Sequence, residues 1–318
     1  MSYAMMGIVY GALAVFAIAV LARALRIKSY PLHVRWEIYP VAHEKGRASY
    51  GGSFMEQTDW WKKPREIDVL GEIRYMVPEI LFLLALREHN PRLWISSFPF
   101  HFGIYLLAGG AAFIVGGAVF QAATGEALAA GMSSVPGTIL YWGAASLWIA
   151  GLALVLAGAL GLLVRRLTDG DLKPYTTAGH VANLLFFLAT MGVAAWHLVA
   201  LDSDPLLGGL RGAVQGLVTL RAVDVTPALF VHVTLLAVLL AYIPVTHMSH
   251  FFTKWFLYHS IRWDDEPNLK GGKYEARINA LLRSPVSWSA PHIKGEGRKS
   301  WLDIATENPA HPREEEKA

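Results

Sequence analysis

Five apolar stretches, each long enough to cross a lipid bilayer as a helix, constrain this sequence more than any other feature. With a window of about 19 residues they cover residues 3–25, 93–121, 136–163, 178–201 and 225–252. The composition agrees, because 54% of the residues are hydrophobic and only 17% are charged, against about a quarter in soluble domains. The sequence therefore predicts an all-α membrane protein whose five transmembrane helices form a bundle.

A sixth apolar stretch, residues 76–86, is too short to span a bilayer and contains Pro78 and Glu79. We expect it to form a helix that lies at the membrane interface or faces a partner protein. The first stretch has no basic segment before it, so we expect a retained span rather than a cleaved signal peptide.

The lysines and arginines predict how the chain lies in the membrane. Twenty-six of the 28 fall within residues 23–92, 165–173 and 254–317, and only Arg211 and Arg221 fall in the two connections on the opposite side. The positive-inside rule then places the N-terminus outside and the C-terminus in the cytoplasm. The pI of about 9.0 is therefore a property of the cytoplasmic face, and we expect no nucleic-acid partner.

The same pattern divides the chain into four parts. Residues 1–25 are the first transmembrane helix, and residues 93–254 form a bundle of four helices. Residues 26–92 and the tail, 255–318, are long cytoplasmic segments rich in tryptophan, proline and charge. We expect the first segment, and the tail up to about residue 304, to dock a cytoplasmic subunit, and the last ten or so residues to be disordered. The alternative is surface loops with an interfacial aromatic belt.

Histidine is the residue through which this chain can bind a redox cofactor. The absence of cysteine excludes disulfides, thiolate metal sites, iron–sulfur clusters held by this chain and covalent c-type haem. Ionisable residues inside membrane spans are costly and suggest a functional site. Six of the twelve histidines lie in or at the ends of the predicted spans: His101, His180, His197, His232, His247 and His250.

Helix spacing and depth sort four of these histidines into two pairs. His232 and His250 are 18 residues apart, which in one continuous helix is five turns, so they share a face about 27 Å apart. By depth in the membrane, His101 matches His250 near the cytoplasmic surface, and His197 matches His232 near the outer surface. The pattern predicts two b haems, each with two axial histidines.

Simpler explanations remain open. A single histidine in a membrane span is about as often a hydrogen-bonding group between helices as a metal ligand. His180 and His247 are interpreted as groups that support a ligand or face the haem propionates. The second span is also rich in glycine, which lets a flat macrocycle, or simply another helix, approach the backbone: Gly103, Gly109, Gly110, Gly116 and Gly117.

Two motifs make the chain similar to a known family. The chain resembles the membrane cytochrome b (gamma) subunit of respiratory nitrate reductase at two places. They are Phe100-His101-Phe102-Gly103 and the last span, with His232, Pro244 and His250. The resemblance covers roughly residues 93–255. It implies that His101 and His250 bind the cytoplasm-proximal haem and that His232 binds the distal haem.

The family's second distal ligand lies ten residues after the histidine at position 101, where this chain has Ala111. This departure puts the distal haem in doubt or moves its ligand. His197 is at a suitable depth to replace the missing ligand, although the family does not supply that residue.

The parts outside the bundle suggest a branch of the family. Two such parts resemble relatives that partner heterodisulfide-reductase-like iron–sulfur proteins, as in membrane complexes linked to sulfite reduction. They are the segment from Arg35-Trp-Glu-Ile-Tyr-Pro40 to Trp60-Trp-Lys-Lys-Pro-Arg65 and the tail around Pro285–His292 and Trp301. The resemblance implies a subunit of a quinol-dependent oxidoreductase in the cytoplasmic (inner) membrane, active only within its complex. It would exchange electrons between a quinol, menaquinol, and a cytoplasmic iron–sulfur subunit.

The alternative function is a membrane anchor with one haem or none for a cytoplasmic redox enzyme. A transporter is disfavoured, because the span interiors contain no Asp, Glu, Lys or Arg and the chain has no internal repeat. Candidate proton acceptors for quinol lie at outer span ends or loops, where each is also simply a solvated loop residue: Glu126, Asp202, Asp204, Arg211, Arg221 and Asp224.

Overall fold

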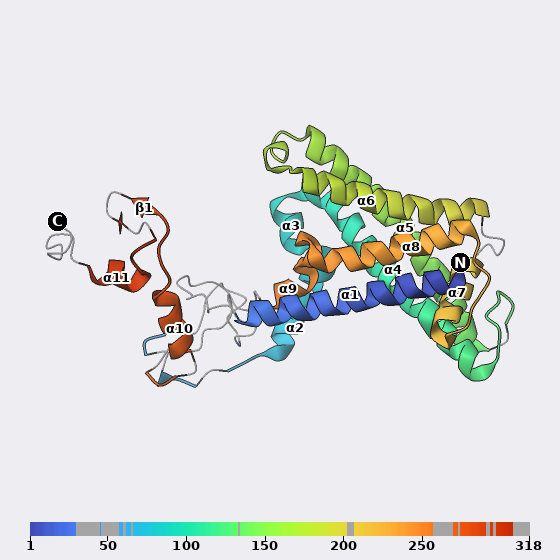
Figure 1. The fold of residues 1–318 in the computed structure, drawn as a ribbon, viewed down its shortest axis with the longest axis horizontal. Coiled ribbons are helices and arrows are strands. Elements are labelled where there is room, and N and C mark those ends of the chain that lie inside the picture. Colours follow the sequence, from blue (N-terminus) through green and yellow to red (C-terminus); the bar gives the residue numbers. More distant parts are fainter. Residues whose placement is uncertain are drawn as a thin grey trace. The chain divides into compact units, whose positions relative to one another are not determined.

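The computed structural model describes most of the chain as helices (Figure 1). The described residues are 1–29, 45, 57–59, 62–64, 66–132, 134–201, 207–256, 270–272, 274–290, 293–294 and 297–307. They fall into two compact units. The first contains Met1–Val20 and Ile73–Met248, and the second contains Leu21–Glu72 and Ser249–Ala318.

Five helices are long and apolar enough to cross a membrane. They are α1 (Ser2–Ser29), α4 (Pro91–Thr124), α5 (Val135–Thr168), α6 (Ala178–Trp196, a span that continues to Ala200) and α8 (Pro227–Tyr242, continuing to Val245). The prediction of an all-α protein with five candidate spans is confirmed. In the first unit α5 packs against α4 and α6, α6 packs against α8, and the short helix α7 (Gly208–Thr219) packs against α4 and α8.

The long helices begin where the sequence supplies caps. The Asn90 side chain accepts a hydrogen bond from the Leu93 amide, and Pro91 occupies the first turn of α4. The Thr226 hydroxyl accepts from the Leu229 amide at the start of α8. These bonds satisfy amides that a helix start leaves without a partner.

Small residues bring α4 and α5 together backbone to backbone. A Cβ placed on Gly103 would lie 2.7 Å from the Val155 amide nitrogen, and one on Gly151 would lie 2.9 Å from the Gly103 carbonyl oxygen. A Cβ on Gly110 would lie 3.1 Å from the Trp148 nitrogen. Of the two roles predicted for the glycines of this span, these contacts show the close approach of another helix.

The last span differs from the prediction. The sequence predicts a continuous helix over residues 225–252, but α8 ends at Tyr242 and is followed by two 3₁₀ turns, Ile243–Val245 and His247–Ser249, before α9 (His250–Phe256). Pro244 has no amide hydrogen to continue the helix, and Thr246 is extended, with φ −110° and ψ −176°. The prediction that His232 and His250 share one helix face is therefore wrong.

The short apolar stretch forms two helices that are not of spanning length. They are α2 (Val69–Phe82) and α3 (Leu84–His89), separated by Leu83 in the left-handed conformation with φ 52°. The Trp94 indole donates to the Phe82 carbonyl at 2.7 Å, and the Tyr105 hydroxyl donates to the Ile80 carbonyl at 3.1 Å. These bonds tie α2 to α4, and no residue of α2 is buried. Its position at a membrane interface stays a prediction.

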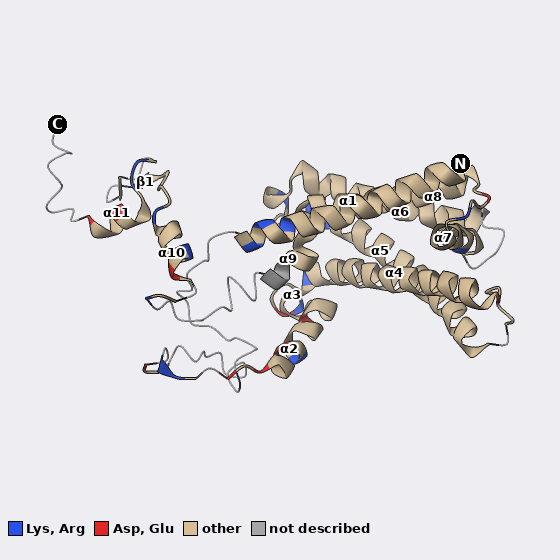
Figure 2. Ribbon diagram, turned by 60° about the horizontal axis from the view of Figure 1, so that its bottom comes forward, with Lys and Arg blue, Asp and Glu red and all other residues tan. Residues whose placement is uncertain are grey.

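Basic residues lie at the ends of the long helices. Figure 2 shows the long helices α4, α5, α6 and α8 almost entirely without charge along their length. In the first unit Arg92 begins α4 and Arg165 and Arg166 end α5, which runs antiparallel to α4, so these arginines share one end. Arg211 lies in α7 and Arg221 follows it, at the other end. Within the first unit Arg92, Arg165 and Arg166 thus lie at the end opposite to Arg211 and Arg221, and the orientation of the chain in a membrane stays a prediction.

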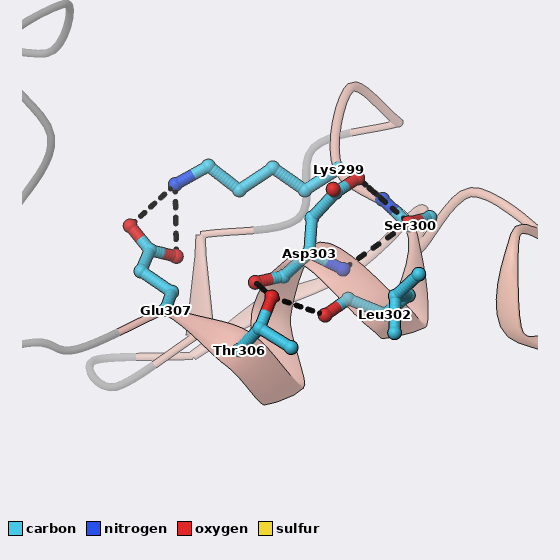
Figure 3. A network of polar contacts seen from close by, with 6 residues as sticks. All are labelled: Lys299, Ser300, Leu302, Asp303, Thr306 and Glu307. Atoms are coloured by element: carbon cyan, nitrogen blue, oxygen red, sulfur yellow. Dashed lines mark hydrogen bonds and ion pairs between the residues drawn. The ribbon is translucent and has the colours of Figure 1, made fainter.

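The second unit contains a small folded part of the tail. Helix α10 (Glu275–Leu282) is followed by a two-stranded antiparallel sheet, β1 (Ser289–Ala290) and β2 (Ile293–Lys294), and by α11 (Trp301–Thr306). Figure 3 shows how α11 is fixed. The Ser300 hydroxyl accepts from the Asp303 amide while the Asp303 carboxylate accepts from the Ser300 amide, and Lys299 pairs with Glu307 at 2.8 Å. Residues 308–318, where we expect a disordered end, lie outside the described residues.

The glycine contacts lead to a test of helix packing. We expect Gly103→Ala to destabilise the protein by about 1–3 kcal/mol, because the new methyl group meets backbone atoms of α5 that cannot rotate away. Gly192→Ala in α6 is the matched control, since no described atom lies within 4 Å of a Cβ at that position. It should leave stability unchanged or raise it by up to about 1 kcal/mol. Thermal unfolding of both variants in detergent measures the difference, and equal effects would contradict backbone contact at Gly103.

Candidate functional site

Two histidines face each other in the interior of the first unit. The ring centres of His197 and His232 are 5.2 Å apart, with 50° between the ring planes. His197 is 4% exposed and His232 is 2% exposed. Within the described part of the chain, neither ring nitrogen of His232 has a hydrogen-bond partner. An imidazole buried in this way loses its hydration without compensation, so the arrangement is costly unless the nitrogens serve another purpose.

The backbone around His197 is unusual. Helix α6 ends at Trp196, and residues His197–Leu201 form a π-helical turn, η4. Such turns are rare and occur frequently at functional sites. His232 is the sixth residue of α8, which begins at the end of the unit where α6 finishes. The structure therefore brings together, from two helices, the pair predicted from depth in the membrane.

The pair has the chemistry of a bis-histidine site. Among the described residues no group of three or more His, Cys, Asp or Glu side chains is placed to hold a metal ion. Two protein ligands suffice for haem iron, because the porphyrin supplies the remaining nitrogens. A metal–imidazole bond is about 2.0–2.1 Å long, so an iron between two rings needs their centres about 6 Å apart. The observed 5.2 Å is shorter, so the two rings would have to move apart by about 1 Å to hold an iron between them.

His101 is oriented by its own helix. Its Nδ1 lies 2.8 Å from the Ser97 carbonyl oxygen, which can only accept, so Nδ1 carries the proton and the ring's lone pair is on Nε2. Metal-binding histidines usually have this arrangement, with one nitrogen donating to a carbonyl. The Phe100 ring meets His101 edge-on at 5.3 Å and also contacts Phe187 of α6.

His250 begins α9 and is exposed. It belongs to the second unit, whereas His101 belongs to the first. The pairing of His101 with His250 therefore stays a prediction.

Ala111 lines an apolar cavity of about 180 Å³. The cavity lies between α1, α4, α5, α7 and α8, and Trp148 and Val233 are among its walls. Of the described residues no histidine lines it. Its volume is close to that of cavities of about 150 Å³ that accommodate benzene, which is too small for a porphyrin. His232 instead meets His197 of η4, so the position that carries a ligand in the resembled family contributes no metal-binding atom here.

The proposed proton acceptors separate into two kinds. The Arg211 guanidinium donates to the Tyr141 carbonyl at 2.7 Å and lies 3.9 Å from the centre of the Tyr141 ring, so it ties α7 to α5. The others are open to solvent at least in part, since Arg221 and Asp224 are exposed and Glu126 is half-buried. Asp202 and Asp204 lie outside the described residues. No quinol ligand is assigned from these contacts.

A second polar cluster joins residues that sequence reasoning treated separately or missed. The rings of His180 and His247 meet edge-on at 5.3 Å. Asn183 reaches His247 at 3.3 Å through its amide nitrogen and accepts a hydrogen bond from the Tyr242 hydroxyl at 2.6 Å. Arg166 approaches His180 at 3.5 Å. The sequence indicated only that His180 and His247 lie at the same end of the bundle, and gave no sign of their contacts with the other residues.

Comparison with known proteins gave no further assignment. No protein-family model, characterised protein or solved structure was found to match this chain. The contacts of the histidines and the resemblance of the two motifs therefore carry the functional proposal.

The unpartnered nitrogens of His232 allow a test without any cofactor. In protein produced without haem, we expect His232→Leu to raise the free energy of unfolding by about 1–3 kcal/mol, because an apolar side chain of similar size removes an uncompensated buried polar group. His89→Leu, at an exposed position of α3, should change it by no more than about 0.5 kcal/mol. Chemical unfolding in detergent measures both. A destabilised His232→Leu protein would mean that the imidazole is satisfied in the folded chain.

Proposed function

We propose that this chain is the membrane cytochrome b subunit of a respiratory complex. Two b haems would be held by His197 with His232 and by His101 with His250. Through them the chain would exchange electrons between a quinol, menaquinol, and a cytoplasmic iron–sulfur subunit. The observation that carries the proposal is the buried pair His197 and His232, whose rings meet between two membrane-length helices while both nitrogens of His232 lack a partner among the described residues.

The residues around the candidate ligands suit an electron carrier. Bis-histidine haem supplies one-electron chemistry at an iron with no open coordination position. The Ser97 carbonyl fixes the tautomer and orientation of His101. Buried apolar side chains such as Leu229 and Val233 flank the distal pair along the chain of α8 and exclude water. Ligand basicity, hydrogen bonding and burial are the means by which a protein sets the potential of its haem.

The proposed partner follows from charge, exposed aromatic residues and the resemblance. Basic residues gather at one end of the first unit, which the positive-inside rule assigns to the cytoplasm. In the folded tail Trp288 and Trp301 lie 6.1 Å apart and are 46% and 43% exposed. Exposed aromatic groups of this kind are typical of protein interfaces. The resemblance supplies the partner's class, a heterodisulfide-reductase-like iron–sulfur protein; most of residues 26–65 lies outside the described part.

Activity would then belong to the complex rather than to the chain alone. The chain would act as the quinol-dependent oxidoreductase subunit in the cytoplasmic membrane, with quinol and lipid as its membrane-side partners. Five helices of spanning length support a multi-pass membrane protein.

A membrane anchor with one haem or none is the second candidate. The observation that favours it is Ala111, which lines an apolar cavity at the position where the resembled family has a ligand. Haem content separates the two candidates.

Single histidine substitutions test the assignment of ligand pairs. We expect two b haems per chain in the unaltered protein, measured as the pyridine haemochromogen. His197→Ala and His232→Ala should each remove the same haem, because the two side chains face one site. His101→Ala should remove the other. His89→Ala is the control and should retain both haems, since that residue is exposed on α3.

Redox titration of the variants identifies which haem is lost. If His197→Ala retained both haems while His232→Ala lost one, the ligand would not have moved to position 197. One haem in the unaltered protein would favour the single-haem anchor. The absence of haem in a preparation made with haem supplied would contradict the cytochrome proposal altogether.

A further inference from the structure

The cluster of Arg166, His180, Asn183, Tyr242 and His247 lies where three membrane helices end. Arg166 is third from the end of α5, His180 is the third residue of α6, and Tyr242 is the last residue of α8. All five residues belong to the first unit. Because these helices are long enough to span a membrane, we place their ends at the depth of the lipid headgroups or beyond. The cluster is therefore at a polar boundary rather than in the hydrocarbon region.

Hydrogen bonds of the buried Asn183 connect the cluster to two neighbouring segments. Asn183 is 6% exposed, its carbonyl oxygen accepts from Tyr242, and its amide nitrogen faces the His247 ring. The Phe186 ring packs edge-on against Tyr242 at 5.5 Å. A buried amide with both ends engaged between two helices fixes the position of the exposed His247 above it.

Arg166 and His180, the other polar residues of the cluster, have hydrogen-bond donors. His180 Nδ1 accepts a hydrogen bond from the Thr177 amide at 3.1 Å, so this nitrogen holds the lone pair and the ring proton is on Nε2. Arg166 also approaches Nδ1, at 3.5 Å. A guanidinium is always charged and has five donors, of which an imidazole lone pair can satisfy one. The cluster thus offers the Arg166 donors and the His180 Nε2–H to a ligand.

The positive charge of Arg166 has no acidic counterpart among the described residues. Its neighbour Arg165 differs, because that guanidinium pairs with Asp169 at 3.5 Å. A half-buried cation beside two imidazoles favours an anion, and a planar guanidinium matches the oxygens of phosphate or carboxylate.

We infer that this cluster is a binding site for an oxyanion, with Arg166 and His180 as its donors. Two sources carry oxyanions to this depth. One is the phosphate of an anionic phospholipid, which basic sites between helices on the cytoplasmic side of a membrane bind. The other is a haem propionate, because Phe187, one turn beyond Asn183 on α6, contacts Phe100 next to His101. The lipid source is independent of the proposed function, whereas the haem source rests on it.

The experiment compares Arg166→Gln with Arg165→Gln in the full-length protein purified in mild detergent. Each variant loses one positive charge, but only Arg166 belongs to the cluster. Short-chain phosphatidylglycerol is titrated into each protein and binding is followed by native mass spectrometry. If the ligand is lipid phosphate, Arg166→Gln should bind about tenfold more weakly or worse, and Arg165→Gln should bind as the unaltered protein does. Arg166→Lys keeps the charge but not the planar fork of donors, so it should bind more tightly than Arg166→Gln and more weakly than the unaltered protein, a graded order that a fault in folding would not produce.

The midpoint potentials of the haems test whether the ligand is a haem propionate. If the ligand is a haem propionate, lipid binding stays unchanged, and Arg166→Gln shifts one of the two haem midpoint potentials to lower values while Arg165→Gln shifts neither. A preparation without haem contradicts the proposed function, but the phosphatidylglycerol titration can still be measured on it. If Arg166→Gln and Arg165→Gln are alike in lipid binding and in both potentials, the oxyanion site is refuted.

Discussion

The contact between the backbones of α4 and α5 is the interaction on which the rest of the bundle depends. In a bilayer the lipid tails are as apolar as leucine, so burial of side chains gives helices little reason to associate. Close approach through glycine replaces that driving force with dispersion contacts along the whole interface. His101 lies on the glycine-rich helix, and α6, which carries the π-helical turn with His197, packs against α5. The pair of helices thus positions His101 directly and His197 through α6.

A polar side chain buried without a hydrogen-bond partner costs free energy, so the partners of the polar side chains in the spans are informative. Within the described spans Asn183 and His101 have defined hydrogen-bond partners. Four side chains in these spans contain buried polar atoms with no partner in the described part of the chain: Trp148, Thr190 and Thr234 with one atom each, and His232 with both ring nitrogens. A buried polar group without a partner marks a place where a bound ligand, a water or a strained functional geometry belongs. His232 differs from the other three in that both of its ring nitrogens are unpartnered and its ring faces a second buried imidazole.

The sequence predicted four of the five spans to within a few residues, because hydropathy over a long window averages out local detail. It failed at the last span. Proline is tolerated within membrane helices when neighbours satisfy the freed groups, so Pro244 alone does not reveal whether a helix bends or ends. Depth in the membrane still paired His197 with His232, since depth depends on distance from a span end. The cluster around Asn183 was not predicted, because contacts across helices depend on how each helix is rotated about its axis, which one sequence does not specify.

The π-helical turn at the end of α6 has a consequence for how such a site changes over evolutionary time. A π turn holds one residue more than an α turn, and each residue of an α-helix turns the chain by about 100°. Loss of the codon for residue 197 would bring Leu198 to the position that faces His232, whereas loss of one of the codons 198–201 would turn only the residues that follow; the start of α6 would stay intact in both cases. The side chain that faces His232 is therefore open to change by deletion as well as by substitution.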